Sequence, residues 1–136
     1  MFTFTVNGEP VPQPRARIST RGGFGRAYVP SAHPIHEYRA AIAAAAVAAG
    51  VTRSAGHVRM LIHCVFVRPK SHFLKSGLRA TAPKFLKSDT DNLLKGIMDA
   101  LTGIAYEDDR QVGDERLIKS WGLESFTRVE IDEIPA

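Results

Sequence analysis

The chain has 136 residues, 44% of them hydrophobic and 24% charged, which is enough for one globular domain with its own core. A single cysteine, Cys64, excludes a disulfide framework and any metal site built from several cysteines, and it favours a reducing compartment. The longest apolar stretch, residues 40–49, is half as long as a membrane span. The first residues lack a signal-peptide pattern. We therefore expect a cytoplasmic protein that is neither exported nor inserted into a membrane.

The net charge of +4 is distributed unevenly along the chain. Residues 1–39 sum to +3 and residues 53–95 to +7, whereas residues 96–136 sum to −6. A basic first two-thirds is typical of nucleic-acid binders, because lysine and arginine release counterions when they neutralise phosphates. A merely solvated surface would have the same charge, so the function must be argued from motifs.

Alternating apolar residues predict an opening strand over residues 2–6. Two prolines within residues 11–17 remove backbone donors and fix φ, so this segment is expected to be an extended basic loop. The glycine-rich residues 21–26 lack the lysine and the spacing of a phosphate-binding P-loop and are interpreted as a mobile connection. Proline at the start and glycine at the end predict a helix over residues 34–50.

Apolar residues occupy both faces of a strand predicted over residues 58–67, so we expect a central strand covered on both sides. Residues 70–87 form a long polar segment with five lysines or arginines, interpreted as a functional or disordered loop. A second helix is predicted over residues 90–102, and residues 116–134 are expected to form a hairpin. The core stripe of the second helix is expected to be Leu94, Ile97, Met98 and Leu101.

The start of the second predicted helix carries a cluster of acidic residues. Asp89 and Asp91 are two residues apart in extended chain and therefore point the same way. Asp91, Lys95 and Asp99 follow at i, i+4 positions on one helix face, opposite the core stripe. Carboxylates clustered in this way suit Mg²⁺ or Mn²⁺.

A third carboxylate for such a site can come from Asp108 or Asp109, which follow the helix after a short turn. Each feature taken singly also has a structural interpretation, as a helix cap, a surface ion pair or a solvated turn. A calcium-binding EF-hand is excluded, because Leu94 occupies its glycine position and Ala100 its bidentate glutamate position.

The combination is more informative than any of its parts. It reads Asp-x-Asp-Asn-x-x-Lys at residues 89–95, Asp-Ala-Leu at residues 99–101 and Asp-Asp-x-Gln-Val at residues 108–112. On these motifs the sequence closely resembles the RusA family of Holliday junction resolvases, small endonucleases of bacteria and their prophages. The resemblance is strongest across residues 89–112 and looser outside them.

The resemblance implies an α/β (α+β) fold, a small mixed β-sheet with two main helices packed on it. It implies a single domain over residues 1–136, with a basic loop around residues 68–87, and a bacterial or phage-encoded homodimer that binds four-way DNA junctions. The family's catalytic aspartates map onto Asp89, Asp91 and Asp109, with Asp108 as the alternative ligand, and its essential lysine maps onto Lys95. The implied cofactor is Mg²⁺, for which Mn²⁺ can substitute, with no organic cofactor.

We therefore expect a metal-dependent endonuclease that resolves Holliday junctions by paired symmetric nicks in recombination and repair, leaving 5′-phosphate ends. Lys95 would orient the scissile phosphate as a point charge. Contacts to the DNA backbone are expected from Arg15, Arg17, Lys70, Lys75, Arg79, Lys84 and Lys87. Two other functions share these features: a non-catalytic DNA-binding phage accessory protein, and a general nuclease that cuts flaps or forks.

Overall fold

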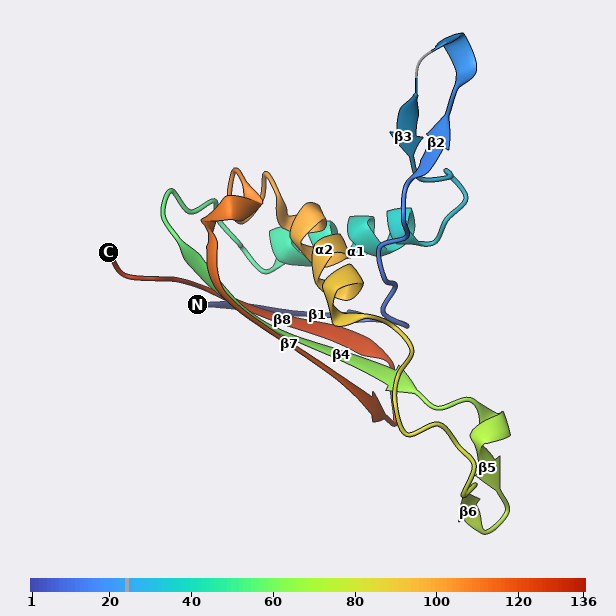
Figure 1. The fold of residues 1–136 in the computed structure, drawn as a ribbon. Helices are drawn as coiled ribbons and strands as arrows, with labels where there is room; N and C mark the ends of the chain where they lie inside the picture. Colours follow the sequence, from blue (N-terminus) through green and yellow to red (C-terminus); the bar gives the residue numbers. More distant parts are fainter. Residues whose placement is uncertain (24) are drawn as a thin grey trace.

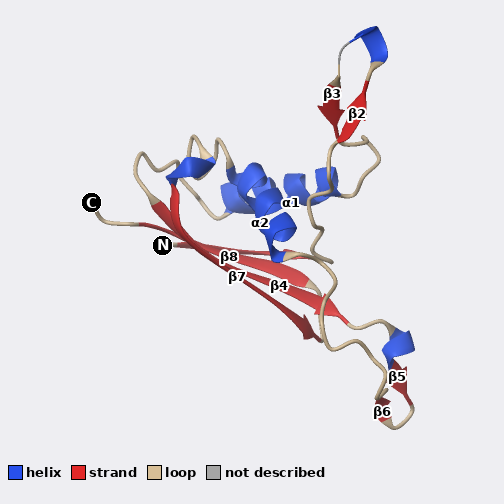
Figure 2. Ribbon diagram, in the orientation of Figure 1, coloured by secondary structure: helices blue, strands red, loops and turns tan. Residues whose placement is uncertain are grey.

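A four-stranded sheet and two helices that lie on one of its faces form the body of the molecule (Figures 1 and 2). The computed structural model describes residues 1–23 and 25–136, but not the side chain of Arg17. The elements in chain order are β1 (Phe2–Asn7), β2 (Arg17–Ser19), η1 (Arg21–Gly23), β3 (Arg26–Tyr28), α1 (Ile35–Ala48), β4 (Val58–Val67), η2 (Lys70–His72), β5 (Phe73–Leu74), β6 (Gly77–Leu78), α2 (Thr90–Leu101), η3 (Asp109–Gln111), β7 (Val112–Gly122) and β8 (Phe126–Glu133). The predicted α+β class, a mixed sheet with two helices packed on it, is confirmed.

The strand order of the main sheet is β1-β8-β4-β7. β4 pairs parallel with β7 on one side and antiparallel with β8 on the other. The expected hairpin over residues 116–134 is therefore wrong, because its two strands lie on opposite sides of β4. The linker between them, residues 123–125, need only cross two strand spacings, about 10 Å, which is within the reach of three residues.

The core lies between the helices and one face of the sheet. Val58, Met60, Ile62, Cys64 and Phe66 of β4 all point into it and are buried. The opposite face of β4 leaves Leu61 37% and Val67 46% exposed. The expectation that β4 is covered on both faces is therefore wrong, because among the described residues both long helices lie on the same side (Figure 1). A few exposed apolar side chains on an open sheet face are tolerated by soluble proteins.

The two helices pack on each other as well as on the sheet. In α2 the fully buried side chains are those of Leu93, Ile97 and Leu101, whereas Leu94 and Met98 are only partly buried. The predicted core stripe omits Leu93, so the buried face of α2 is turned by about one residue from the face that the stripe predicts. The polar side of α2, which carries Lys95, faces away from the core as the helical spacing predicts.

Two small hairpins project from the body (Figure 1). β2 and β3 pair antiparallel and form one hairpin, and η1 lies between them in the sequence. β5 and β6 pair antiparallel and form the other, within the basic segment of residues 70–87. The basic segment of residues 70–87 is expected to be a loop, and it contains two short strands instead. In the described part of the chain, no helix is both long and apolar enough to cross a membrane.

Candidate active site

The start of α2 presents two acidic side chains to solvent. Asp89 is the N-cap residue of the helix, but its carboxylate makes no capping hydrogen bond, and Asp91 lies in the first turn. Both side chains are exposed, and neither forms an ion pair with another described residue. These carboxylates are therefore available for a ligand.

The loop that leads to Asp89 is fixed by a residue that sequence reasoning missed. The Lys119 ammonium, on β7, donates hydrogen bonds to the carbonyl oxygens of Leu86 at 3.2 Å and Ser88 at 2.7 Å. The indole of Trp121, two residues along the same strand, approaches the carbonyl oxygen of Lys84 at 3.4 Å. The sheet thus holds the backbone just before Asp89.

Lys95 joins the helix to the second acidic segment. Its ammonium lies 3.1 Å from Asp99, one turn along α2, and 3.6 Å from Asp109, which precedes β7. The hydrogen bond to Asp99 is the main reason why the pKa of Lys95 is raised, and Asp109 contributes less. Arg39 of α1 approaches the same Asp99 carboxylate at 3.9 Å. Asp99 therefore lies between two cations.

The neighbouring acids Asp108 and Asp109 have different surroundings. Asp108 caps η3: its carboxylate accepts a hydrogen bond from the backbone N–H of Arg110 at 2.9 Å and pairs with the Arg110 guanidinium at 3.2 Å. The backbone hydrogen bond is the main reason why the pKa of Asp108 is lowered. Asp109 is instead the one that approaches Lys95. The structure thus gives Asp108 a structural role and places Asp109 beside the lysine.

Gln111 fastens this acidic turn to the rest of the fold. Its side-chain oxygen accepts hydrogen bonds from the backbone N–H groups of Glu107 at 2.9 Å and Asp108 at 3.2 Å. Its side-chain nitrogen donates to the carbonyl oxygens of Ser54 and Gly56, each at 2.9 Å. Asp109 is thereby held at a defined place relative to the strand that follows.

The donor chemistry of these acids fits a hard cation, since Asp89, Asp91 and Asp109 offer only carboxylate oxygens. Within residues 1–23 and 25–136, no three side chains of His, Cys, Asp or Glu are placed to hold one metal ion. The set of metal ligands therefore stays a prediction. The structure places Asp109 beside Lys95, on one side of α2. Asp91 lies on the same side of α2, four residues before Lys95.

A groove of about 460 Å³ lies beside Asp89. Two of the predicted DNA-contacting residues, Arg15 and Lys87, line it, together with Asn92 of α2. The backbone N–H of Gln13 donates to the Asn92 carbonyl oxygen at 2.9 Å, which ties the proline-rich segment to the helix. The groove thus combines two cations with one of the predicted catalytic acids.

The other predicted DNA-contacting residues are spread over the two hairpin segments. Lys70, Lys75 and Lys84 are exposed, and Arg79 donates to the carbonyl oxygen of Ser71 at 2.9 Å, within its own segment. Arg17 belongs to β2, but its side chain lies outside the described part of the structure. Sequence reasoning therefore identified basic segments rather than a single basic surface.

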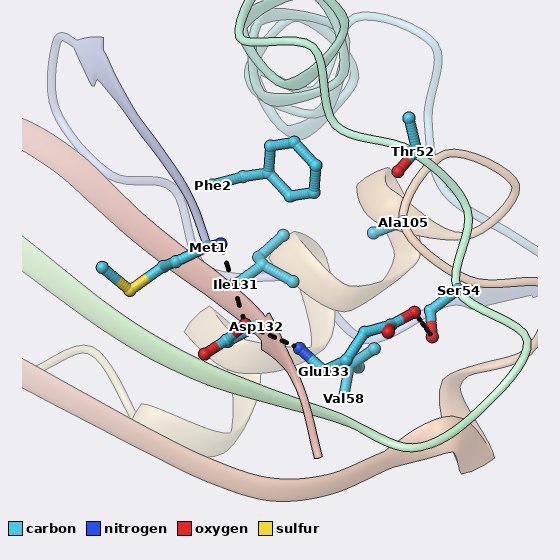
Figure 3. A pocket seen from close by; sticks show the side chains of 9 residues that line it. All are labelled: Met1, Phe2, Thr52, Ser54, Val58, Ala105, Ile131, Asp132 and Glu133. Carbon is cyan, nitrogen blue, oxygen red and sulfur yellow. Dashed lines mark hydrogen bonds and ion pairs between the residues drawn. The ribbon is translucent and has the colours of Figure 1, made fainter. Parts of the chain in front are cut away.

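A separate hollow of about 280 Å³ lies where the N-terminus, β8 and the loop before β4 meet (Figure 3). The Ser54 hydroxyl donates to the Glu133 carboxylate at 2.7 Å, and the N-terminal ammonium of Met1 pairs with Asp132 at 3.7 Å. None of the nine residues that line it is a predicted site residue. Its charged groups are paired, Glu133 with Ser54 and Asp132 with the N-terminus, as Figure 3 shows, so we interpret it as a structural junction.

These features define a small α+β protein in which Asp89 lines a basic groove at the start of α2, and further acidic residues and a lysine lie along the exposed side of that helix. The chain matches the family Endodeoxyribonuclease RusA over residues 7–132, and it belongs to this family of nucleases. It is also 34% identical over 138 residues, 98% of this chain and 96% of the relative, to the uncharacterized protein YqaN of Bacillus subtilis strain 168. The resemblance noted on the acidic motifs therefore extends over nearly the whole chain.

Proposed function

We propose that this protein is a homodimeric, Mg²⁺-dependent endonuclease that resolves four-way DNA junctions by paired nicks in recombination and repair. Membership of the RusA endodeoxyribonuclease family supports a nuclease that acts on branched DNA. The proposal for the active site depends on one contact, the 3.6 Å approach of Lys95 to Asp109. On one side of α2, this contact joins two acidic segments that are far apart in the sequence.

In this proposal Asp89, Asp91 and Asp109 would hold the metal. Bound Mg²⁺, or Mn²⁺ in its place, would supply an activated water and stabilise the charge that develops on the leaving 3′ oxygen, so that 5′-phosphate ends result. Lys95 binds a non-bridging oxygen of the scissile phosphate. It acts as a charge and not as a base, because its pKa is raised and its ammonium therefore stays protonated at neutral pH.

The proposed contacts to the DNA backbone begin at the groove beside Asp89. Arg15 and Lys87 line this groove, so a strand that enters it would have two phosphates neutralised next to the acidic cluster. A homodimer suits a substrate with two equivalent strands, because a two-fold axis would place one active site at each of them.

The test is cleavage of a synthetic four-way junction, with each strand end-labelled in turn, in Mg²⁺ or in EDTA. Wild type should give paired nicks in opposing strands that require the metal, whereas Asp91→Asn should bind the junction without cutting it. Binding without nicks in either Mg²⁺ or Mn²⁺ would contradict the proposal and indicate a non-catalytic DNA-binding protein. Flap and fork substrates in the same assay would show whether the junction is preferred.

The pair Asp109→Asn and Asp108→Asn tests the third acid. We expect Asp109→Asn to cut about 100-fold more slowly or not at all, because it removes a metal ligand. Asp108→Asn removes a carboxylate one residue away and should cut within about threefold of wild type, since its carboxylate caps η3 and pairs with Arg110. The opposite ranking, with intact folding of both variants by circular dichroism, would assign Asp108 as the ligand.

A further inference from the structure

The β2–β3 hairpin exposes side chains that contribute little to folding and are accessible to a binding partner. Ile18 is 76% and Tyr28 45% exposed, and Arg21 and Arg26 are exposed as well. An isolated two-stranded hairpin is marginally stable in water, and exposed apolar side chains contribute little to its stability. The hairpin nevertheless projects from the body in Figure 1, away from the sheet and its helices.

The charge around the hairpin has one sign. Residues 10–36 contain four arginines and no aspartate or glutamate. Neither Arg21 nor Arg26 forms an ion pair with another described residue. A segment with unpaired arginines and no acid is complementary to a polyanion. Since the chain belongs to a family of DNA endonucleases, DNA is the polyanion that this surface fits.

The base of the hairpin is tied to the helix that carries the acidic cluster. In the proline-rich segment that leads into it, the Gln13 backbone N–H donates to the carbonyl oxygen of Asn92 of α2 at 2.9 Å. The Gln13 side chain accepts from the Arg39 guanidinium at 3.2 Å. The groove beside Asp89 includes Arg15, two residues before β2. DNA that lies in this groove would therefore continue towards the hairpin.

We propose that the β2–β3 hairpin is a DNA-binding arm that contacts the duplex next to the cleaved phosphodiester. Arg21 and Arg26 neutralise backbone phosphates, and Tyr28, which shares one face of the hairpin with Arg26, packs on the sugar beside it. A two-stranded ribbon has the width of the major groove of B-DNA. In Figure 1 the β5–β6 hairpin projects from the body in a different direction from the β2–β3 hairpin. This inference rests on the proposed function, because it assumes that the substrate is branched DNA.

The experiment measures binding of an immobile four-way junction by fluorescence anisotropy in EDTA, between 50 and about 250 mM KCl. Arg21→Ala/Arg26→Ala is compared with Arg59→Ala/Arg116→Ala, which removes two exposed arginines from the open face of the sheet. If each arm arginine neutralises one phosphate, the arm variant should lower the slope of log K against log salt by about 1.8. At 0.15 M salt this corresponds to about 30-fold weaker binding. The control should stay within about twofold of wild type.

A second variant, Ile18→Ser/Tyr28→Ser, separates DNA from a protein partner. It should weaken junction binding with an unchanged salt slope and an unchanged sedimentation coefficient. A changed oligomeric state with unchanged DNA affinity would overturn the proposal and assign the hairpin to a contact between copies of the chain.

The arm proposal is also overturned if the arginine variant binds like its control. In that case junction cleavage by wild type leaves the proposed function intact. If wild type neither binds nor cuts the junction, both proposals fail.

Discussion

Asp99→Asn tests whether an ion pair positions the lysine of the active site. Asp99 lies 3.1 Å from the Lys95 ammonium, but it belongs to neither of the two acidic segments proposed to bind metal. Both ion pairs of Asp99, with Lys95 and with Arg39, are partly exposed, so their loss should cost about 1 kcal/mol or less of folding stability. A lysine side chain carries about 2 kcal/mol of rotamer entropy. Releasing Lys95 can therefore raise the barrier to cleavage by up to about 2 kcal/mol, roughly 30-fold in rate.

The assay is single-turnover cleavage of the junction at saturating Mg²⁺, with junction affinity measured separately in EDTA. We expect Asp99→Asn to lower the cleavage rate constant by about 5- to 30-fold and to leave the affinity unchanged. Asp99→Glu should recover part of the rate, because it restores a carboxylate partner. Asp114→Asn, which removes an exposed carboxylate on β7, is the matched control.

Two results would refute this positioning role. A rate within twofold of wild type would mean that the Lys95–Asp99 pair does not matter for cleavage. A rate as low as that of Asp91→Asn, recovered by raising the Mg²⁺ concentration, would mean that Asp99 is itself a metal ligand. The intermediate rate expected here is distinct from both.

Two further predictions concern stability. A Cβ atom at Gly122 would overlap the side chain of Val65, so Gly122→Ala should lower the free energy of unfolding by about 1–3 kcal/mol. A Cβ atom at Gly56 meets only open space, so Gly56→Ala should leave the free energy of unfolding unchanged. Urea denaturation measures both, and equal effects of the two substitutions would refute the steric argument. Burial raises the pKa of the Cys64 thiol from 9.0 to about 11, and that of Tyr38 is raised for the same main reason, so the folded state favours their neutral forms. The free energy of unfolding should therefore stay constant up to about pH 9 and fall between pH 9 and 11, and Cys64 should account for up to about 3 kcal/mol of that fall. If the Cys64 thiol of the folded protein reacted with a disulfide reagent at pH 8 as fast as that of the urea-unfolded protein, this prediction would be contradicted.

Local patterns in the sequence predict the elements of the body well. The strand expected over residues 58–67 is β4 with the same bounds, and the helix expected over residues 90–102 is α2 with one residue fewer. Both succeed because a period of two or of 3.6 residues records which side faces the core. The order of the strands leaves no such record. Nothing local in residues 116–134 tells a hairpin from two strands that flank a third, because the choice depends on how well β4 fits between them.

In the candidate site, too, local spacing predicts some features, and others depend on contacts between distant parts of the chain. The spacing of Asp91, Lys95 and Asp99 places them on one helix face, and the Lys95–Asp99 contact confirms this part. The residues that position the site act on backbone carbonyl oxygens far along the chain, as Lys119 does at the loop before Asp89. A single polar residue with a distant backbone partner has no sequence signature. Such residues become visible only when the fold is known.

The different surroundings of Asp108 and Asp109 could have been predicted from the sequence, because residues 108–111 form a second motif besides the acidic pair. Asp108-Asp109-Arg110-Gln111 has the form of a capping box, in which the first side chain bonds forward to the turn and the fourth bonds back. The structure contains both bonds. A carboxylate that satisfies the backbone N–H groups of its own turn must point into that turn, so only the next residue is free to face Lys95. The hydrogen-bonding needs of this short turn therefore account for why Asp109, and not Asp108, lies beside Lys95, and the role of Asp109 as a metal ligand stays a proposal.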